Sequence, residues 1–259
     1  MLDTFRGILI PFLGTVLGAA CVLFLQKNLN RTVQRILTGF AAGVMTAASV
    51  WSLLIPALEQ AQDTMGRLAF LPAAGGFLLG IFFLLLLDRM IPHLHMNSSE
   101  AEGIHTKLSK SAMLILAVTL HNIPEGMAVG LSFALAVQSG SPALMAGAVS
   151  LALGIGVQNL PEGAAVALPL LDAGLPKRTA FAVGALSALV EPVFGVLAAL
   201  AVTVAQPLMP WLLGFAAGAM LLVTVRELIP EACGGAERAG TLSVLAGFLL
   251  MMILDVALG

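Results

Sequence analysis

Eight apolar stretches follow one another along the chain and are separated by short polar breaks. They cover residues 7–25, 36–58, 69–91, 111–137, 143–171, 179–204, 209–230 and 240–258. A helix that crosses a membrane needs about 20 consecutive apolar residues, and each stretch reaches or approaches this length. The pattern therefore predicts an all-α polytopic membrane protein with eight transmembrane helices, which form a single domain over residues 1–259.

The amino-acid composition supports a lipid environment. Hydrophobic residues make up 59% of the chain and charged residues only 10%, whereas soluble domains are about 25% charged. The net charge of −2 gives no electrostatic basis for binding nucleic acid. Small residues recur at the spacing that lets helices approach closely, as at Gly39 and Gly43 or Gly214 and Gly218. We therefore expect tight helix packing, and such faces are compatible with a homodimer.

Basic residues are concentrated on one side of the predicted bundle. Nine of the twelve Lys and Arg residues follow the first, third, fifth and seventh stretches: Lys27, Arg31, Arg35, Arg89, Lys107, Lys110, Lys177, Arg178 and Arg238. Basic loops of membrane proteins face the cytoplasm. We therefore expect both termini outside the cytoplasm, and the histidine-containing hydrophilic loop 92–110 inside it.

Three pairs of similar segments indicate an internal repeat. The segments are HNIPEGMAVGL (121–131) and QNLPEGAAVAL (158–168), GFAAGVM (39–45) and GFAAGAM (214–220), and GIFFLLLLD (80–88) and GFLLMMILD (247–255). In each pair one helix runs inward and the other outward, which is typical of inverted repeats. The sequence thus predicts that helices 1–3 and 6–8 are related around the central helices 4 and 5. Helices 1 and 6 should be partners too, although their sequences show no clear match.

Three acidic residues lie deep inside the predicted spans. Glu125 and Glu162 are near the centres of the fourth and fifth stretches, and Glu191 is about half-way along the sixth. Each ionised carboxylate at the centre of a bilayer costs about 2.5–3.5 kcal/mol. The only basic residue within a span, Arg226, is near a helix end. A bound metal ion is therefore the expected source of compensating charge.

The spacing of the polar residues supports a metal site. His121 and Glu125 are four residues apart and share a face of their helix, and Gln158 and Glu162 repeat this geometry on the next helix. An asparagine precedes each of the two glutamates by three residues: Asn122 and Asn159. The alternative is a buried polar network that only specifies packing.

The motifs HNIPEG and QNLPEG on consecutive central helices resemble those of the ZIP family of zinc and iron transporters, in its GufA-type branch. The resemblance implies transport of a divalent transition metal into the cytoplasm across the inner membrane of a prokaryote. Zn²⁺ is the first choice, with Fe²⁺, Mn²⁺, Cd²⁺, Cu²⁺ and Ni²⁺ as further candidates. It also implies a site for two ions. The first would be bound by Met45, His121, Glu125, Gln158 and Glu162, and the second by Asn122, Glu125, Asn159, Glu162 and Glu191.

Polar residues nearer the helix ends are candidates for metal entry and exit. They are Ser52, Asp88, His93, His95, Glu227 and Glu231. Two other functions remain open at this point, a channel for the same ions and an intramembrane metalloenzyme. The enzyme is disfavoured because the chain has no HExxH motif, so we expect a protein that is not an enzyme.

Overall fold

The computed structural model describes residues 2–24, 30–90, 110–172, 174–204, 206–234 and 238–258. Every element within these ranges is a helix, which confirms the predicted all-α class. Most of the predicted cytoplasmic loop, with His93 and His95, lies outside the described residues.

The helices correspond to the eight predicted spans. The first is α1 (Leu2–Phe24), and the second is α2 (Arg31–Ala48), η1 (Ser49–Leu54) and α3 (Ile55–Met65). The third is η2 (Gly66–Leu68) and α4 (Phe70–Met90), the fourth α5 (Lys110–Ser139) and the fifth α6 (Pro142–Asp172). The sixth is α7 (Lys177–Ser187) and α8 (Val190–Val204). After η3 (Gln206–Leu208), the seventh is α9 (Met209–Val223), η4 (Thr224–Leu228) and α10 (Ile229–Cys233), and the eighth is α11 (Ala239–Leu258).

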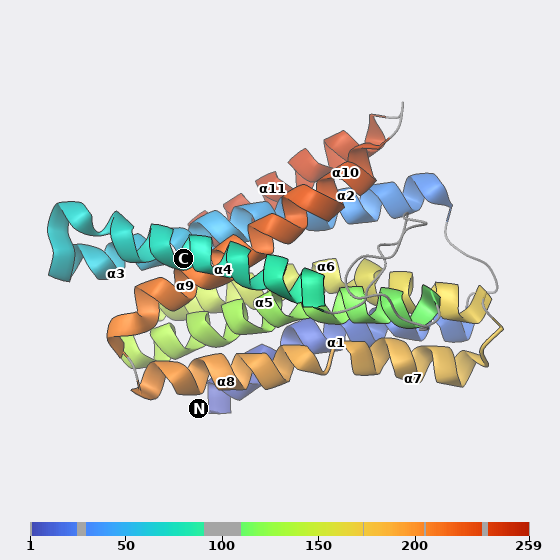
Figure 1. The fold of residues 1–259 in the computed structure, drawn as a ribbon, viewed down its shortest axis with the longest axis horizontal. Helices are drawn as coiled ribbons and strands as arrows, with labels where there is room; N and C mark the ends of the chain where they lie inside the picture. Colours follow the sequence, from blue (N-terminus) through green and yellow to red (C-terminus); the bar gives the residue numbers. More distant parts are fainter. Residues whose placement is uncertain are drawn as a thin grey trace.

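Length and hydropathy support this membrane topology. Seven of the described segments are long and apolar enough to cross a bilayer, and α5 is an eighth helix of 30 residues. The helices run along the long axis of the molecule, and both ends of the chain lie toward the same end of it (Figure 1). That is the arrangement expected for an even number of crossings; which end faces the cytoplasm stays a prediction.

The helices pack in two groups that follow the predicted repeat. α2 packs along α11 and α4 along α9, while α1 packs along α6 and α5 along α8. Glycines make equivalent contacts in the first group. A Cβ atom added at Gly43 would clash with the carbonyl oxygen of Val244, and one added at Gly218 would clash with that of Phe77. Phe77 and Val244 each lie three residues before the third pair of similar segments, so they are equivalent positions and the two halves pack in the same way.

The same comparison relates the first and sixth spans, which sequence alone did not match. Gly126 and Gly163 are equivalent residues of the twin motifs. A Cβ atom at Gly126 would clash with the carbonyl oxygen of Glu191, and one at Gly163 would clash with that of Thr15. Thr15 on α1 therefore occupies the position that Glu191 occupies on α8.

Three spans are not the continuous α-helices that hydropathy suggests. The second and seventh contain the π-helical segments η1 and η4, each of which begins four residues after the matching methionine, Met45 or Met220. The sixth is interrupted at residues 188–189. Pro192 has no N–H to donate to the carbonyl oxygen of Ala188, which accepts from the Glu191 N–H instead (3.0 Å). Glu191 therefore lies in the first turn of α8 rather than in the middle of a helix.

Candidate metal site

The centre of the site is a contact between the two long helices α5 and α6. Glu125 on α5 and Gln158 on α6 are each only 1% exposed. The Gln158 amide nitrogen donates to Glu125 Oε1 at 2.8 Å. The two helices are therefore joined by a buried hydrogen bond to a carboxylate at the depth where the sequence predicted the metal.

Two oxygen atoms at this contact lack hydrogen-bond donors. Among the described residues, Glu125 Oε2 and Gln158 Oε1 are buried acceptors with no partner. A buried acceptor without a partner costs about 1–3 kcal/mol, and more when it is charged. A divalent cation bound between these oxygens would remove that cost, so the donor set fits a metal ion.

Glu162, the second glutamate of the twin motifs, is only partly buried, unlike Glu125. With its amide turned so that the nitrogen donates, Asn122 on α5 hydrogen-bonds to Glu162 Oε1 and to the carbonyl oxygen of Val118. The site thus has a second amide–carboxylate bond between α5 and α6, at its more accessible edge.

Glu191 is held by partners on two other helices. Thr15 Oγ1 on α1 donates to Glu191 Oε1 (3.0 Å), and Asn159 Nδ2 on α6 donates to Glu191 Oε2 (3.1 Å). Glu191 also lies in the first turn of α8. The N-terminal end of a helix carries a partial positive charge, which favours a negative charge on a side chain there. Thr15 was missed from sequence because a threonine inside an apolar helix is common, and only the packing of α1 shows its contact.

Six of the eight predicted ligands are brought together: Asn122, Glu125, Gln158, Asn159, Glu162 and Glu191. Met45 is buried on α2, and its recorded contact is with Thr224 Oγ1, 3.9 Å from the thioether sulfur. The side chain of His121 lies outside the described part of the structure. Among the described residues, no group of three or more His, Cys, Asp or Glu side chains is arranged for a metal; the amide oxygens of the site are further donors that it offers.

The entry and exit candidates lie at opposite ends of the bundle. At one end, Ser52 Oγ donates to both carboxylate oxygens of Asp255, at 3.0 and 3.1 Å. At the other end, Asp88 forms an ion pair of 2.6 Å with Arg226. Asp88 and Asp255 close the third pair of similar segments, so the repeat places one acidic residue near each end. Glu227 and Glu231 are partly buried near the Arg226 pair.

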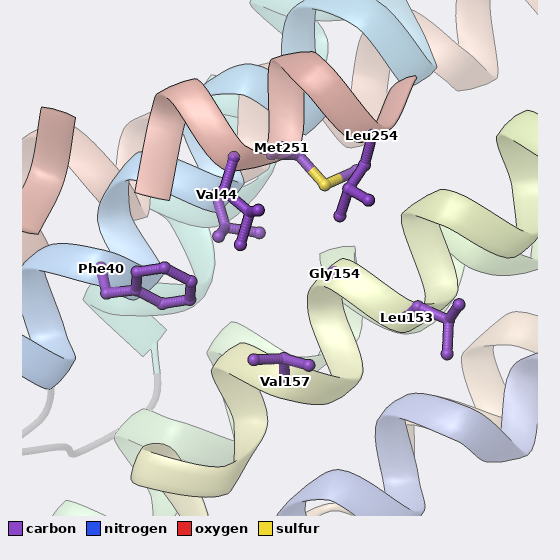
Figure 2. A pocket seen from close by; sticks show the side chains of 8 residues that line it. Phe40, Val44, Leu153, Gly154, Val157, Met251 and Leu254 are labelled. Carbon is purple, nitrogen blue, oxygen red and sulfur yellow. The ribbon is translucent and has the colours of Figure 1, made fainter. Parts of the chain in front are cut away.

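A separate pocket lies where α6 meets α2 and α11 (Figure 2). Its lining is wholly apolar: Phe40, Val44, Leu153, Gly154, Val157, Leu250, Met251 and Leu254. A site for a divalent metal needs several oxygen, nitrogen or sulfur donors, and the side chains of this lining offer only the Met251 thioether. This pocket is therefore not the metal site, although Val157 is the residue that precedes Gln158.

Known proteins resemble this chain over nearly its whole length. A family model described as ZIP zinc transporter matches residues 95–255. The zinc transporter ZIP11 of Xenopus tropicalis is 36% identical over 338 aligned residues, which cover 100% of both chains. The zinc transporter GufA of Myxococcus xanthus is 41% identical, over 95% of this chain and 94% of its own. The zinc transporter ZIPB of Bordetella bronchiseptica is 40% identical, over 96% of this chain and 79% of its own.

Proposed function

The chain belongs to the ZIP zinc transporter family, and we propose that it carries Zn²⁺ across a membrane into the cytoplasm through the site between α5 and α6. The metal is the transported substrate. Imidazole, amide, carboxylate and thioether donors suit borderline metals better than Ca²⁺ or Mg²⁺. The same donor set therefore admits Fe²⁺, Mn²⁺, Cd²⁺, Cu²⁺ and Ni²⁺ as further substrates.

Two oxygens, Glu125 Oε2 and Gln158 Oε1, are the main structural support for this proposal. Both belong to the twin motifs, and both are buried without a hydrogen-bond donor among the described residues. A network that existed only to hold the helices together would satisfy its buried acceptors, as almost all such networks do. Two acceptor oxygens without donors, one on each of the two facing helices, are instead available to coordinate a cation that binds and then leaves.

The burial of the site favours a carrier over a channel. Glu125 and Gln158 are 1% exposed, and Asn122 and Asn159 are fully buried. A channel needs a continuous passage through its binding site, whereas a carrier encloses its substrate between two arrangements of the helices. The partly exposed Glu162 lies toward the Asp172 end of α6. The starts of α2 (Arg31) and α7 (Lys177) are at that same end of the bundle (Figure 1). Under the positive-inside rule this end is cytoplasmic, which supports inward release.

Uptake of ⁶⁵Zn²⁺ into proteoliposomes tests the proposal. Wild-type protein should give saturable uptake, and Glu125→Ala should abolish it because the substitution removes the buried anionic ligand. Glu59→Ala is the matched control, since Glu59 is an exposed carboxylate on α3, and it should leave uptake near the wild-type rate. Undiminished uptake by a correctly folded Glu125→Ala protein would place the ion path elsewhere.

A further inference from the structure

We infer that Asn159 limits the site to one metal ion by holding Glu191 in a hydrogen-bonded arrangement that excludes a second. The inference rests on the proposed function, because it concerns how many ions occupy the same transport site. It bears on the second ligand set expected from the sequence, which contains Asn159 and Glu191.

Both carboxylate oxygens of Glu191 already accept hydrogen bonds. Thr15 Oγ1 donates to Oε1 at 3.0 Å, and Asn159 Nδ2 donates to Oε2 at 3.1 Å. Glu191 is completely buried. Both oxygens therefore have protein donors, and the start of α8 favours a negative charge on them, so a metal ion is not required to satisfy them.

The amide of Asn159 has a defined orientation. Its nitrogen lies 3.3 Å from the carbonyl oxygen of Pro11 and 3.1 Å from Glu191 Oε2, and both of these atoms are acceptors. Its oxygen faces the Gln158 amide nitrogen at 3.4 Å. Turning the amide over would place its oxygen against two other acceptors and leave them without a donor. Asn159 therefore presents N–H groups, which cannot bind a cation, to the space beside Glu191.

The first ligand set differs from the surroundings of Glu191 in its hydrogen bonding. Gln158 Oε1 belongs to the first ligand set alone, whereas Glu125 is shared by both sets; among the described residues, neither Gln158 Oε1 nor Glu125 Oε2 has a hydrogen-bond donor. An ion in the first position can use Gln158 Oε1, which has no other partner, whereas an ion beside Glu191 must compete with the Thr15 and Asn159 hydrogen bonds for the carboxylate oxygens. The distribution of satisfied and unsatisfied oxygens therefore favours occupation of one position only.

The substitution Asn159→Asp should allow a second ion to bind beside Glu191. Asn159→Asp keeps the shape of the side chain, removes the N–H donor and sets a second carboxylate directly beside Glu191. Two adjacent buried carboxylates repel each other, and a bound cation relieves that repulsion. We therefore expect the variant to acquire a second zinc ion that wild-type protein lacks.

Zinc stoichiometry of purified protein in nanodiscs measures the effect, by equilibrium dialysis against Zn²⁺ followed by elemental analysis. All proteins carry alanine at His93, His95 and His105, so that the loop does not contribute ions, and none carries a histidine tag. Wild-type protein should bind one ion and Asn159→Asp two. Asn159→Asp combined with Glu191→Gln should return to one. X-ray absorption should show a zinc–zinc distance of about 3.5–4 Å, the usual separation in two-metal sites, only in Asn159→Asp.

The wild-type protein and Glu191→Gln decide the inference even if Asn159→Asp fails to fold. Two ions in wild-type protein with a zinc–zinc signal would overturn it. So would loss of the single ion in Glu191→Gln, because Glu191 would then be a ligand of that ion. A wild-type protein that binds no zinc and shows no uptake would instead refute the proposed function. A folded Asn159→Asp protein that still binds one ion would show that Asn159 does not set the number.

Discussion

Replacing Gly163 with alanine should both destabilise the protein and slow transport. Gly163 lies on α6 one residue after Glu162, and its Cα faces α1. An added Cβ would come closer to the carbonyl oxygen of Thr15 than the 3.0 Å that Cβ atoms keep from other heavy atoms, and it would also crowd the Ala19 nitrogen. These are backbone atoms, so no side-chain rotation can relieve the clash, and α1 must move away from α6.

The expected magnitude follows from three terms. Overpacking of this kind costs about 1–3 kcal/mol. Displacing α1 weakens the Thr15 hydrogen bond to Glu191, and a bond to a charged group contributes about 1.5–3 kcal/mol. Alanine in a helix gains about 0.8–1 kcal/mol over glycine. The net loss is about 1.5–5 kcal/mol if the hydrogen bond is lost completely, and about 0–2 kcal/mol if it adjusts.

Thermal unfolding of detergent-solubilised protein and zinc uptake form the assay, and the same helix supplies the control. Gly147 is also on α6, but a Cβ added there meets nothing within 4 Å, so Gly147→Ala should be neutral or slightly stabilising. Gly163→Ala should lower the midpoint of unfolding and reduce uptake. Equal stability and uptake in the two variants would refute the close approach of α1 and α6.

Three further predictions concern the ends of the bundle and the pH. Uptake should fall as the pH falls from about 8 to about 5, because protons compete with zinc for the imidazole of His121 and for the carboxylates; a flat profile measured in proteoliposomes would contradict this. Arg226→Gln should cost no more than about 1 kcal/mol of stability, since the guanidinium is 36% exposed in its pair with Asp88, and a double-mutant cycle with Asp88→Asn measures the coupling. Asp255→Asn should raise the KM for zinc and leave kcat nearly unchanged if the Ser52–Asp255 pair attracts ions at entry, while an unaltered KM would exclude that role.

The spans could be located from sequence because hydropathy reports the length of each apolar stretch directly, whether the helix faces lipid or other helices. The stretch 143–171 became α6 (Pro142–Asp172), and 111–137 became α5 (Lys110–Ser139). The break before Glu191 was not predicted, because an apolar run continues through it and Pro192 alone is compatible with a kink or a continuous helix. The π-helical segments η1 and η4 were missed for a similar reason, since one extra residue per turn leaves the hydropathy profile unchanged.

The site was predicted less completely than the fold. Residues four apart share a helix face and the two motifs are copies, so the sequence predicted that both motifs line one site; the structure records a hydrogen bond between Gln158 and Glu125, one residue from each motif. The partners of Glu191 could not be obtained in this way. They come from α1 and α6, 176 and 32 positions away in the chain, and only tertiary packing decides which side chains meet.

The position of Thr15 explains how a symmetric fold can hold an asymmetric site. The repeat relates Thr15 to Glu191, so a fully symmetric chain would carry a glutamate on α1 as well. That residue would add a fourth carboxylate to the membrane interior, at a cost of about 2.5–3.5 kcal/mol, and Glu191 would face an acceptor instead of a donor. With threonine at this position the half containing α1 supplies the hydroxyl that Glu191 needs. The two halves therefore share their packing, whereas the difference between Thr15 and Glu191 sets the charge balance around the candidate metal site.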